Sequence, residues 1–179
     1  MSNYRRYFYE NNYVFLTIVT YNRRPLLIKN IEILRNSFKY TKQKFNFDIV
    51  ACIIMEDHFH LLISTDFPQD IPKIIKMIKI NFTMNIPKYY INNENLSDSR
   101  IRRGEKGIWQ RRYYDHIIRD DEDLYRHIDY IHYNSVKHNN IAPKDWEYST
   151  FNHFVKKGNY ELDWCNYKDK HNIKSMNLE

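Results

Sequence analysis

Cysteine is scarce in this chain, and long apolar runs are missing from it. Only Cys52 and Cys165 occur among 179 residues, and Cys52 lies in an apolar run, where a free thiol packs as a small hydrophobic group. A disulfide framework is therefore excluded, and a reducing, cytoplasmic compartment is expected. No stretch approaches the roughly 18 apolar residues that span a bilayer, and residues 1–21 lack the apolar core and small-residue cleavage site of an export signal. Neither export nor membrane insertion is expected.

Aromatic residues and positive charge are plentiful instead. The chain holds 16 tyrosines and 10 phenylalanines, and 28 Lys and Arg residues exceed 22 Asp and Glu residues for a formal net charge of +6. An isoelectric point near 9.1 favours an anionic partner such as nucleic acid, although a positive charge that only keeps the protein soluble explains it equally well. The length suits one hydrophobic core, so we expect one domain over residues 1–179, with its core at about 12–140 and a C-terminal tail at about 141–179.

The apolar pattern predicts an α+β fold. Runs of β-branched and aromatic residues predict strands at residues 13–21, 47–55, 58–64 and 109–118. Helical spacing predicts helices at residues 31–45, 71–86 and 121–138. The segment at 87–107 is rich in Asn, Ser and Arg and indicates a long exposed loop. This order is that of a ferredoxin-like antiparallel sheet (βαββαβ) with helices on one face, here followed by a third helix. The fold alone does not decide the function, since RNA-binding modules share it.

His58 and His60 are the clearest candidates for chemistry. They lie two residues apart at the start of an apolar strand, and side chains at that spacing leave a strand from the same face. Both imidazoles can therefore reach one metal ion. A chance pair of histidines, each held by an ordinary hydrogen bond, explains this motif about equally well.

The third predicted helix adds a phenol and an amide to these candidates. Its expected buried stripe consists of Leu124, Ile128, Ile131 and Ser135. At about 100° per residue, Tyr130 and Asn134 lie about 40° apart on one flank, one turn apart along the axis, with His127 close by. A phenol oxygen can attack a phosphodiester while a metal ion withdraws charge from the phosphate oxygens. The other interpretation is that Tyr130, one of 16 tyrosines, packs at the edge of the core.

The type of ligand narrows the choice of metal. Imidazole and carbonyl ligands together accommodate Mn²⁺ well and Mg²⁺ less comfortably, while zinc more often recruits a third His, Cys or carboxylate. We therefore expect Mg²⁺ or Mn²⁺, and the sequence does not choose between them.

These residues resemble the single-tyrosine transposases of the HUH class, in which two histidines flank one bulky apolar residue, here Phe59 within MEDHFHLLIS. The chain is more similar still to the REP-associated tyrosine transposases, through YRRY at residues 4–7, WQRRYYDHIIR, DYIHYNSVKH and DWEYSTF. It departs from their pattern at Glu56-Asp57 and at Ser135, where proline is more usual.

The resemblance implies a mechanism and a substrate. Tyr130 would be the nucleophile that forms a covalent 5′-phosphotyrosine and frees a 3′-hydroxyl. The implied metal ligands are His58, His60 and Asn134. The implied substrate is single-stranded DNA beside hairpin, REP-like sequences, in the cytoplasm at the nucleoid. A monomer is favoured over a dimer on the same analogy.

Basic and aromatic residues before and in the fourth predicted strand are candidates for DNA binding, because phosphates need cations and bases need stacking surfaces. The candidates are Arg102, Arg103, Trp109, Arg111, Arg112 and Tyr114. We rank these arginines above the lysines of the second helix, because the planar guanidinium also permits contacts to base edges. Aromatic residues on strands more often belong to the core, so that interpretation of Trp109 and Tyr114 stays open.

Two other functions fit the same residues. A non-catalytic module that binds single-stranded nucleic acid on a ferredoxin-like fold predicts neither metal dependence nor a covalent adduct. Another HUH-class nickase, such as a replication initiator, would share the chemistry. It is less expected, because this sequence carries no helicase or origin-binding extension.

Overall fold

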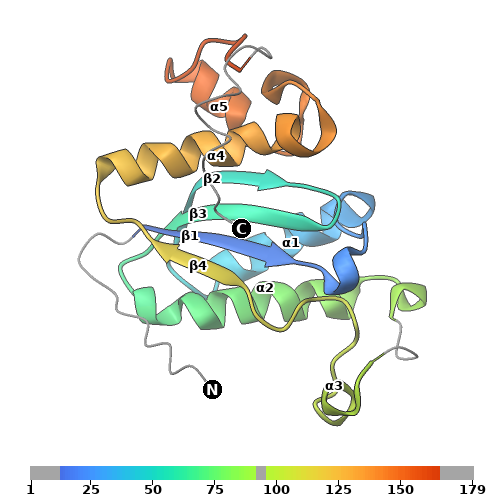
Figure 1. Ribbon diagram of the computed structural model, residues 1–179. Helices are drawn as coiled ribbons and strands as arrows, with labels where there is room; N and C mark the ends of the chain where they lie inside the picture. Colours follow the sequence, from blue (N-terminus) through green and yellow to red (C-terminus); the bar gives the residue numbers. More distant parts are fainter. Residues whose placement is uncertain (1–12, 92–95, 166–179) are drawn as a thin grey trace.

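A four-stranded antiparallel sheet forms the centre of the computed structural model, which describes residues 13–91 and 96–165 (Figure 1). The strands are β1 Tyr13–Val19, β2 Asp48–Ile54, β3 His58–Ser64 and β4 Tyr114–Ile117, in the spatial order β2-β3-β1-β4. β1 and β3 pair in antiparallel register, with Thr17 opposite His60. The order and the directions are those of the expected ferredoxin-like sheet, so that prediction is confirmed.

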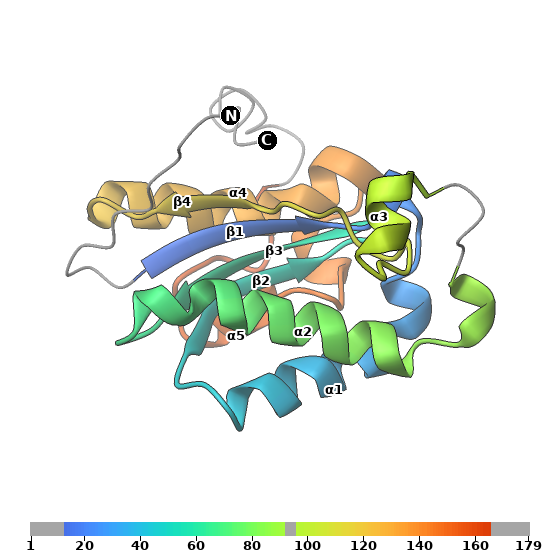
Figure 2. The same ribbon diagram turned by 90° about the horizontal axis from the view of Figure 1, so that it is seen from below.

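Helices cover both faces of this sheet. α1 Ile31–Lys42 and α2 Ile71–Asn85 lie on one face, and α4 Asp121–Asn139 lies on the other (Figures 1 and 2). Because side chains alternate along a strand, Phe59 and Leu61 of β3 join the core beneath α1 and α2, while Leu62 joins the core beneath α4. The same alternation turns His58 and His60 toward α4. The sheet therefore presents both histidines to the helix that carries Tyr130.

The start and the end of α4 follow from local chemistry. The Asp120 side chain accepts a hydrogen bond from the backbone N–H of Asp123 at 2.8 Å and so caps the first turn. Asn140 ends the helix in the left-handed region, with φ of 53°. Acidic residues in the first turn and Lys137 and His138 in the last turn complement the helix dipole.

The buried surface of α4 is wider than one amphipathic stripe. Every residue from 130 to 136 is buried, whereas Leu124 of the expected stripe is only half-buried. The segment that follows α4 explains the difference, because α5 Phe151–Lys156 and Tyr160 pack on the side of the helix away from the sheet, around His132. Tyr130 instead packs against Phe15 and His60 of the sheet, and Tyr130 and Asn134 are 1% and 0% exposed.

Other elements also differ from expectation. The fourth strand begins at Tyr114, and Trp109 makes only an isolated bridge to Thr20. The expected loop at 87–107 contains a short helix, α3 Asp98–Arg102. The YRRY segment at residues 4–7 lies outside the described residues. No helix within the described ranges is long and apolar enough to cross a membrane.

Candidate metal and tyrosine site

His58 and His60 lie side by side beneath α4, and a hydrogen bond at Nδ1 fixes each ring. The ring centroids are 5.0 Å apart, and the residues are 2% and 0% exposed. His58 Nδ1 is hydrogen-bonded to Asp57 Oδ1 at 2.6 Å, and His60 Nδ1 to Thr17 Oγ1 at 2.9 Å. A proton placed on each Nδ1 leaves the lone pair on each Nε2. Both Nε2 atoms are buried without a hydrogen-bond partner, as expected of imidazoles that bind a metal ion.

Tyr130 and Asn134 complete the same cluster from α4. The Tyr130 and His60 rings are 5.3 Å apart. Asn134 Nδ2 donates to the main-chain oxygen of Tyr130 at 2.6 Å, while Asn134 Oδ1 is buried without a hydrogen-bond partner. An unsatisfied buried acceptor costs roughly 1–3 kcal/mol, a cost that a bound cation removes. The donor set of His58, His60 and Asn134 therefore fits a divalent metal ion.

The electrostatics favour a neutral His60 and an ionised Asp57. Burial holds the pKa of His60 well below its usual value, and the nearby His58 lowers it further, while contact with Asn134 acts in the opposite direction. Burial alone would raise the pKa of Asp57, but hydrogen bonds from His58 and Arg23 outweigh it and lower the pKa. At neutral pH the site thus offers a neutral imidazole at His60 and an ionised carboxylate at Asp57 behind His58.

Two residues in the last turn of α4 reach the cluster from the solvent side. Lys137 Nζ donates to Tyr130 Oη at 3.3 Å and lies 5.2 Å from the centroid of the Tyr130 ring. The ring of His138 is 5.1 Å from that of His58. Both residues are exposed. Sequence reasoning missed them, although Lys137 lies two helical turns after Tyr130 and so shares its face.

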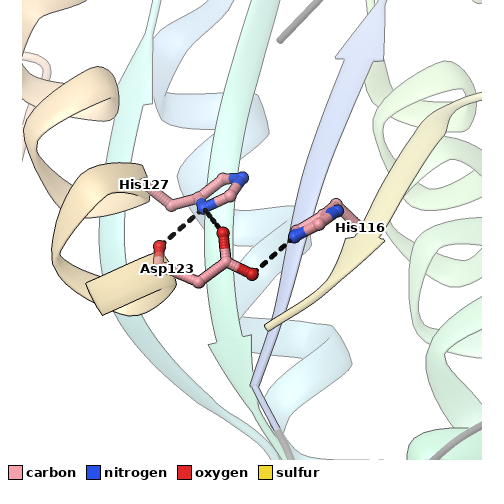
Figure 3. Close-up of side chains that lie close together, drawn as sticks. All are labelled: His116, Asp123 and His127. Carbon is pink, nitrogen blue, oxygen red and sulfur yellow. Dashed lines mark hydrogen bonds and ion pairs between the residues drawn. The ribbon is translucent and has the colours of Figure 1, made fainter. Parts of the chain in front are cut away.

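His127 is not part of this cluster, although the helical pattern placed it beside Tyr130. Its Nδ1 lies 2.7 Å from the main-chain oxygen of Asp123 and 3.3 Å from Asp123 Oδ1 (Figure 3). The Phe15 ring packs against both histidines, with its centroid 5.4 Å from that of His60 and 4.9 Å from that of His127.

The candidate DNA-binding residues lie mostly on the surface. Arg102, Arg103, Arg111 and Arg112 are exposed, and Tyr114 is 42% exposed. Arg111 Nε forms an ion pair with Glu105 Oε1 at 3.0 Å. The other oxygen of the same carboxylate, Oε2, pairs with the guanidinium of Arg100 at 2.6 Å.

Trp109 differs from the other candidates because it belongs to the core. Only 9% of it is exposed, it packs against Phe59 and Phe82, and its Nε1 donates to the main-chain oxygen of Lys79 at 3.1 Å. Its remaining edge lines a cavity of about 620 Å³ between α2 and residues 103–113. Trp109 therefore forms part of the cavity wall, and its ring is too buried to serve as an open stacking surface for bases.

Comparison with known proteins relates this geometry to transposases. The family model described as "Transposase IS200 like" matches residues 8–134. A protein of Haemophilus influenzae, provisionally named a REP-associated tyrosine transposase, is 41% identical over 167 residues, covering 92% of this chain and 93% of that protein. The REP-associated tyrosine transposase of Escherichia coli (strain K12) is 32% identical over 168 residues, covering 92% of each. A solved structure of a REP-associated tyrosine transposase bound to a REP hairpin matches with a TM-score of 0.79 at 29% identity, covering 99% of this chain and 96% of that chain.

Proposed function

The chain belongs to the IS200-like transposase family, and we propose that it cuts and rejoins single-stranded DNA beside REP-like hairpins through a covalent 5′-phosphotyrosine at Tyr130. The observation that carries the proposal is a set of three buried acceptor atoms without hydrogen-bond partners next to one buried phenol. These atoms are His58 Nε2, His60 Nε2 and Asn134 Oδ1.

Those three atoms would hold Mg²⁺ or Mn²⁺, which supplies the charge that polarises the scissile phosphate. Tyr130 Oη attacks phosphorus and forms the new O–P bond. The bond from phosphorus to the 3′ oxygen breaks, and that oxygen leaves with the electron pair and takes up a proton as a 3′-hydroxyl. Rejoining reverses these steps, when a 3′-hydroxyl attacks the phosphotyrosine and releases the phenol. One phosphodiester-type bond replaces another, so no external energy source is needed.

Lys137 has a defined part in this scheme. Its ammonium contacts Tyr130 Oη at 3.3 Å, where negative charge develops as the phenol loses its proton. The same group then lies beside the phosphate that becomes attached to Tyr130. Because Lys137 is exposed, it can follow that phosphate without leaving a buried charge behind.

The family relationship also supports a hairpin as the partner, because the solved relative is bound to a REP hairpin. Arg102, Arg103, Arg111 and Arg112 offer exposed guanidinium groups for phosphates and base edges. Tyr114 offers an exposed ring for stacking. Trp109 contributes through the shape of the cavity that it lines.

A denaturing gel tests the proposal. Wild-type protein is incubated with Mn²⁺ and a library of single-stranded hairpins with 5′ extensions, and protein-linked DNA is scored. We expect an adduct that both EDTA and Tyr130→Phe abolish. Hairpin binding without an adduct under any metal would favour the non-catalytic binding module. An adduct that survives in Tyr130→Phe would show that another residue is the nucleophile.

A further inference from the structure

We propose that His116, Asp123 and His127 form a second divalent metal site, separate from the one proposed at His58, His60 and Asn134, and suited to zinc. His116 lies on β4, and the other two residues lie in the first two turns of α4, so the cluster joins two elements (Figure 3). One ligand atom from each of the three residues lies within 4.8 Å of the others.

The carboxylate of Asp123 lies at the centre of this cluster. His116 Nε2 lies 2.8 Å from Asp123 Oδ2, and His127 Nδ1 lies 3.3 Å from Asp123 Oδ1. The two imidazole rings stack with centroids 4.6 Å apart and planes 15° apart. Figure 3 shows both rings next to the same carboxylate, with His127 on α4 and His116 on β4.

The protonation states suit a cation. Burial raises the pKa of Asp123, but hydrogen bonds from Arg119 and His116 outweigh burial and hold the pKa far below its usual value. Burial lowers the pKa of His127, which keeps its imidazole neutral. His127 is 2% exposed, and its Nε2 has no hydrogen-bond partner. An ionised carboxylate therefore stands beside a neutral imidazole, and a metal ion bound through His127 Nδ1 would displace the 2.7 Å hydrogen bond from that atom to the main-chain oxygen of Asp123.

Two imidazoles and one carboxylate are a ligand set that zinc accepts readily, with water in the fourth position. Ligands at about 2.1 Å from a tetrahedral ion lie roughly 3.4 Å apart, so the three groups need to close in by no more than about 1.4 Å. Arg119, the competing cation, holds Asp123 Oδ2 at 3.0 Å with a side chain that is 70% exposed and free to move into water. Zinc would displace the proton shared by His116 Nε2 and Asp123 Oδ2. It would also take over from Arg119 as the cation that neutralises the Asp123 carboxylate.

The second site shares no ligand with the first, and the fully buried Phe15 ring packs against both His60 and His127. A metal ion there would fasten β4 to α4 one turn before Tyr130 and fix the helix that carries the proposed nucleophile. That consequence rests on the proposed function, whereas the binding of zinc does not.

Zinc stoichiometry of the full chain tests the proposal. After dialysis against ZnCl₂ and removal of loosely bound metal, we expect His116→Ala to hold one zinc ion fewer than wild type, and His116→Ala in the His60→Ala background to hold one fewer than His60→Ala. His153→Ala, at an exposed position of α5, is the matched control and should bind as much zinc as wild type. His116→Ala should weaken zinc binding at the second site by at least about 100-fold.

Co²⁺ substitution gives an independent measurement. In His60→Ala, the ligand-field bands of bound Co²⁺ should persist and then disappear when His116→Ala is added, with the far-ultraviolet circular dichroism unchanged. A zinc content that His116→Ala leaves unchanged, or that His60→Ala alone removes completely, would overturn the proposal. Neither measurement involves DNA, so the outcome is independent of whether Tyr130 forms an adduct.

Discussion

Replacing Lys137 with methionine is expected to slow adduct formation by about tenfold. Lys137 Nζ donates to Tyr130 Oη at 3.3 Å, so the ammonium stands where the phenol oxygen gains negative charge during attack. Methionine keeps most of the apolar stem and removes the charge. The substitution therefore isolates the electrostatic contribution of Lys137 from its packing on α4.

The magnitude follows from the distance and the exposure. Two unit charges 3.3 Å apart attract by roughly 5 kcal/mol at an effective dielectric constant of about 20. Lys137 is exposed, so water and salt screen most of that attraction. A charge-assisted hydrogen bond contributes about 1.5 kcal/mol at the low end of its range, which corresponds to roughly tenfold in rate.

Single-turnover kinetics with saturating DNA and Mn²⁺ measure this effect without a contribution from binding. Lys137→Arg keeps the charge and should retain most of the rate. Lys156→Met, at an exposed position on α5, should leave the rate unchanged. The tenfold difference should shrink as salt is raised. If Lys137→Met reacts within about twofold of wild type at low salt, the ammonium does not act on Tyr130 and its assigned part is wrong.

Three further predictions concern stability, metal binding and DNA binding. Burial lowers the pKa of His132 from 6.5 to about 3. Between these two pH values the unfolded state binds more protons than the folded state, so the free energy of unfolding falls as the pH decreases. In urea titrations, His132→Phe should lose about 2 kcal/mol less stability than wild type between about pH 7.5 and about pH 5, whereas the exposed control His153→Gln should lose as much as wild type. Thr17→Val removes the 2.9 Å hydrogen bond to His60 Nδ1 and should weaken Mn²⁺ binding, measured by calorimetry, about 10- to 100-fold. An unchanged affinity would contradict the role given to Thr17. Arg112→Gln should reduce the dependence of log K for a hairpin on log salt by about 1, whereas Arg35→Gln on α1 should have no effect.

Periodicity explains why much of the site was visible in the sequence. The period of two along β3 placed His58 and His60 on one face, and the helical period placed Tyr130 and Asn134 one turn apart. Both rules depend only on local backbone geometry. The structure brings these four residues together because β3 and α4 pack against each other on one face of the sheet.

Contacts between distant segments were not visible in the same way. Thr17 reaches His60 through the register of β1 against β3, which no local pattern fixes. The sequence left open whether Trp109 stacks on bases or belongs to the core, and its contact with Phe82 of α2 places it in the core. Asp57 was noted only as a departure from the family pattern, yet its carboxylate holds His58 Nδ1.

The point of covalent attachment tests the central claim most directly. Wild-type adduct formed with Mn²⁺ and a hairpin substrate is digested with nuclease and protease, and the peptide that carries the residual nucleotide is sequenced by tandem mass spectrometry. We predict a phosphodiester-linked nucleotide on Tyr130 and on no other tyrosine. A nucleotide on Tyr133, or on any tyrosine outside the cluster of His58, His60 and Asn134, would contradict the mechanism.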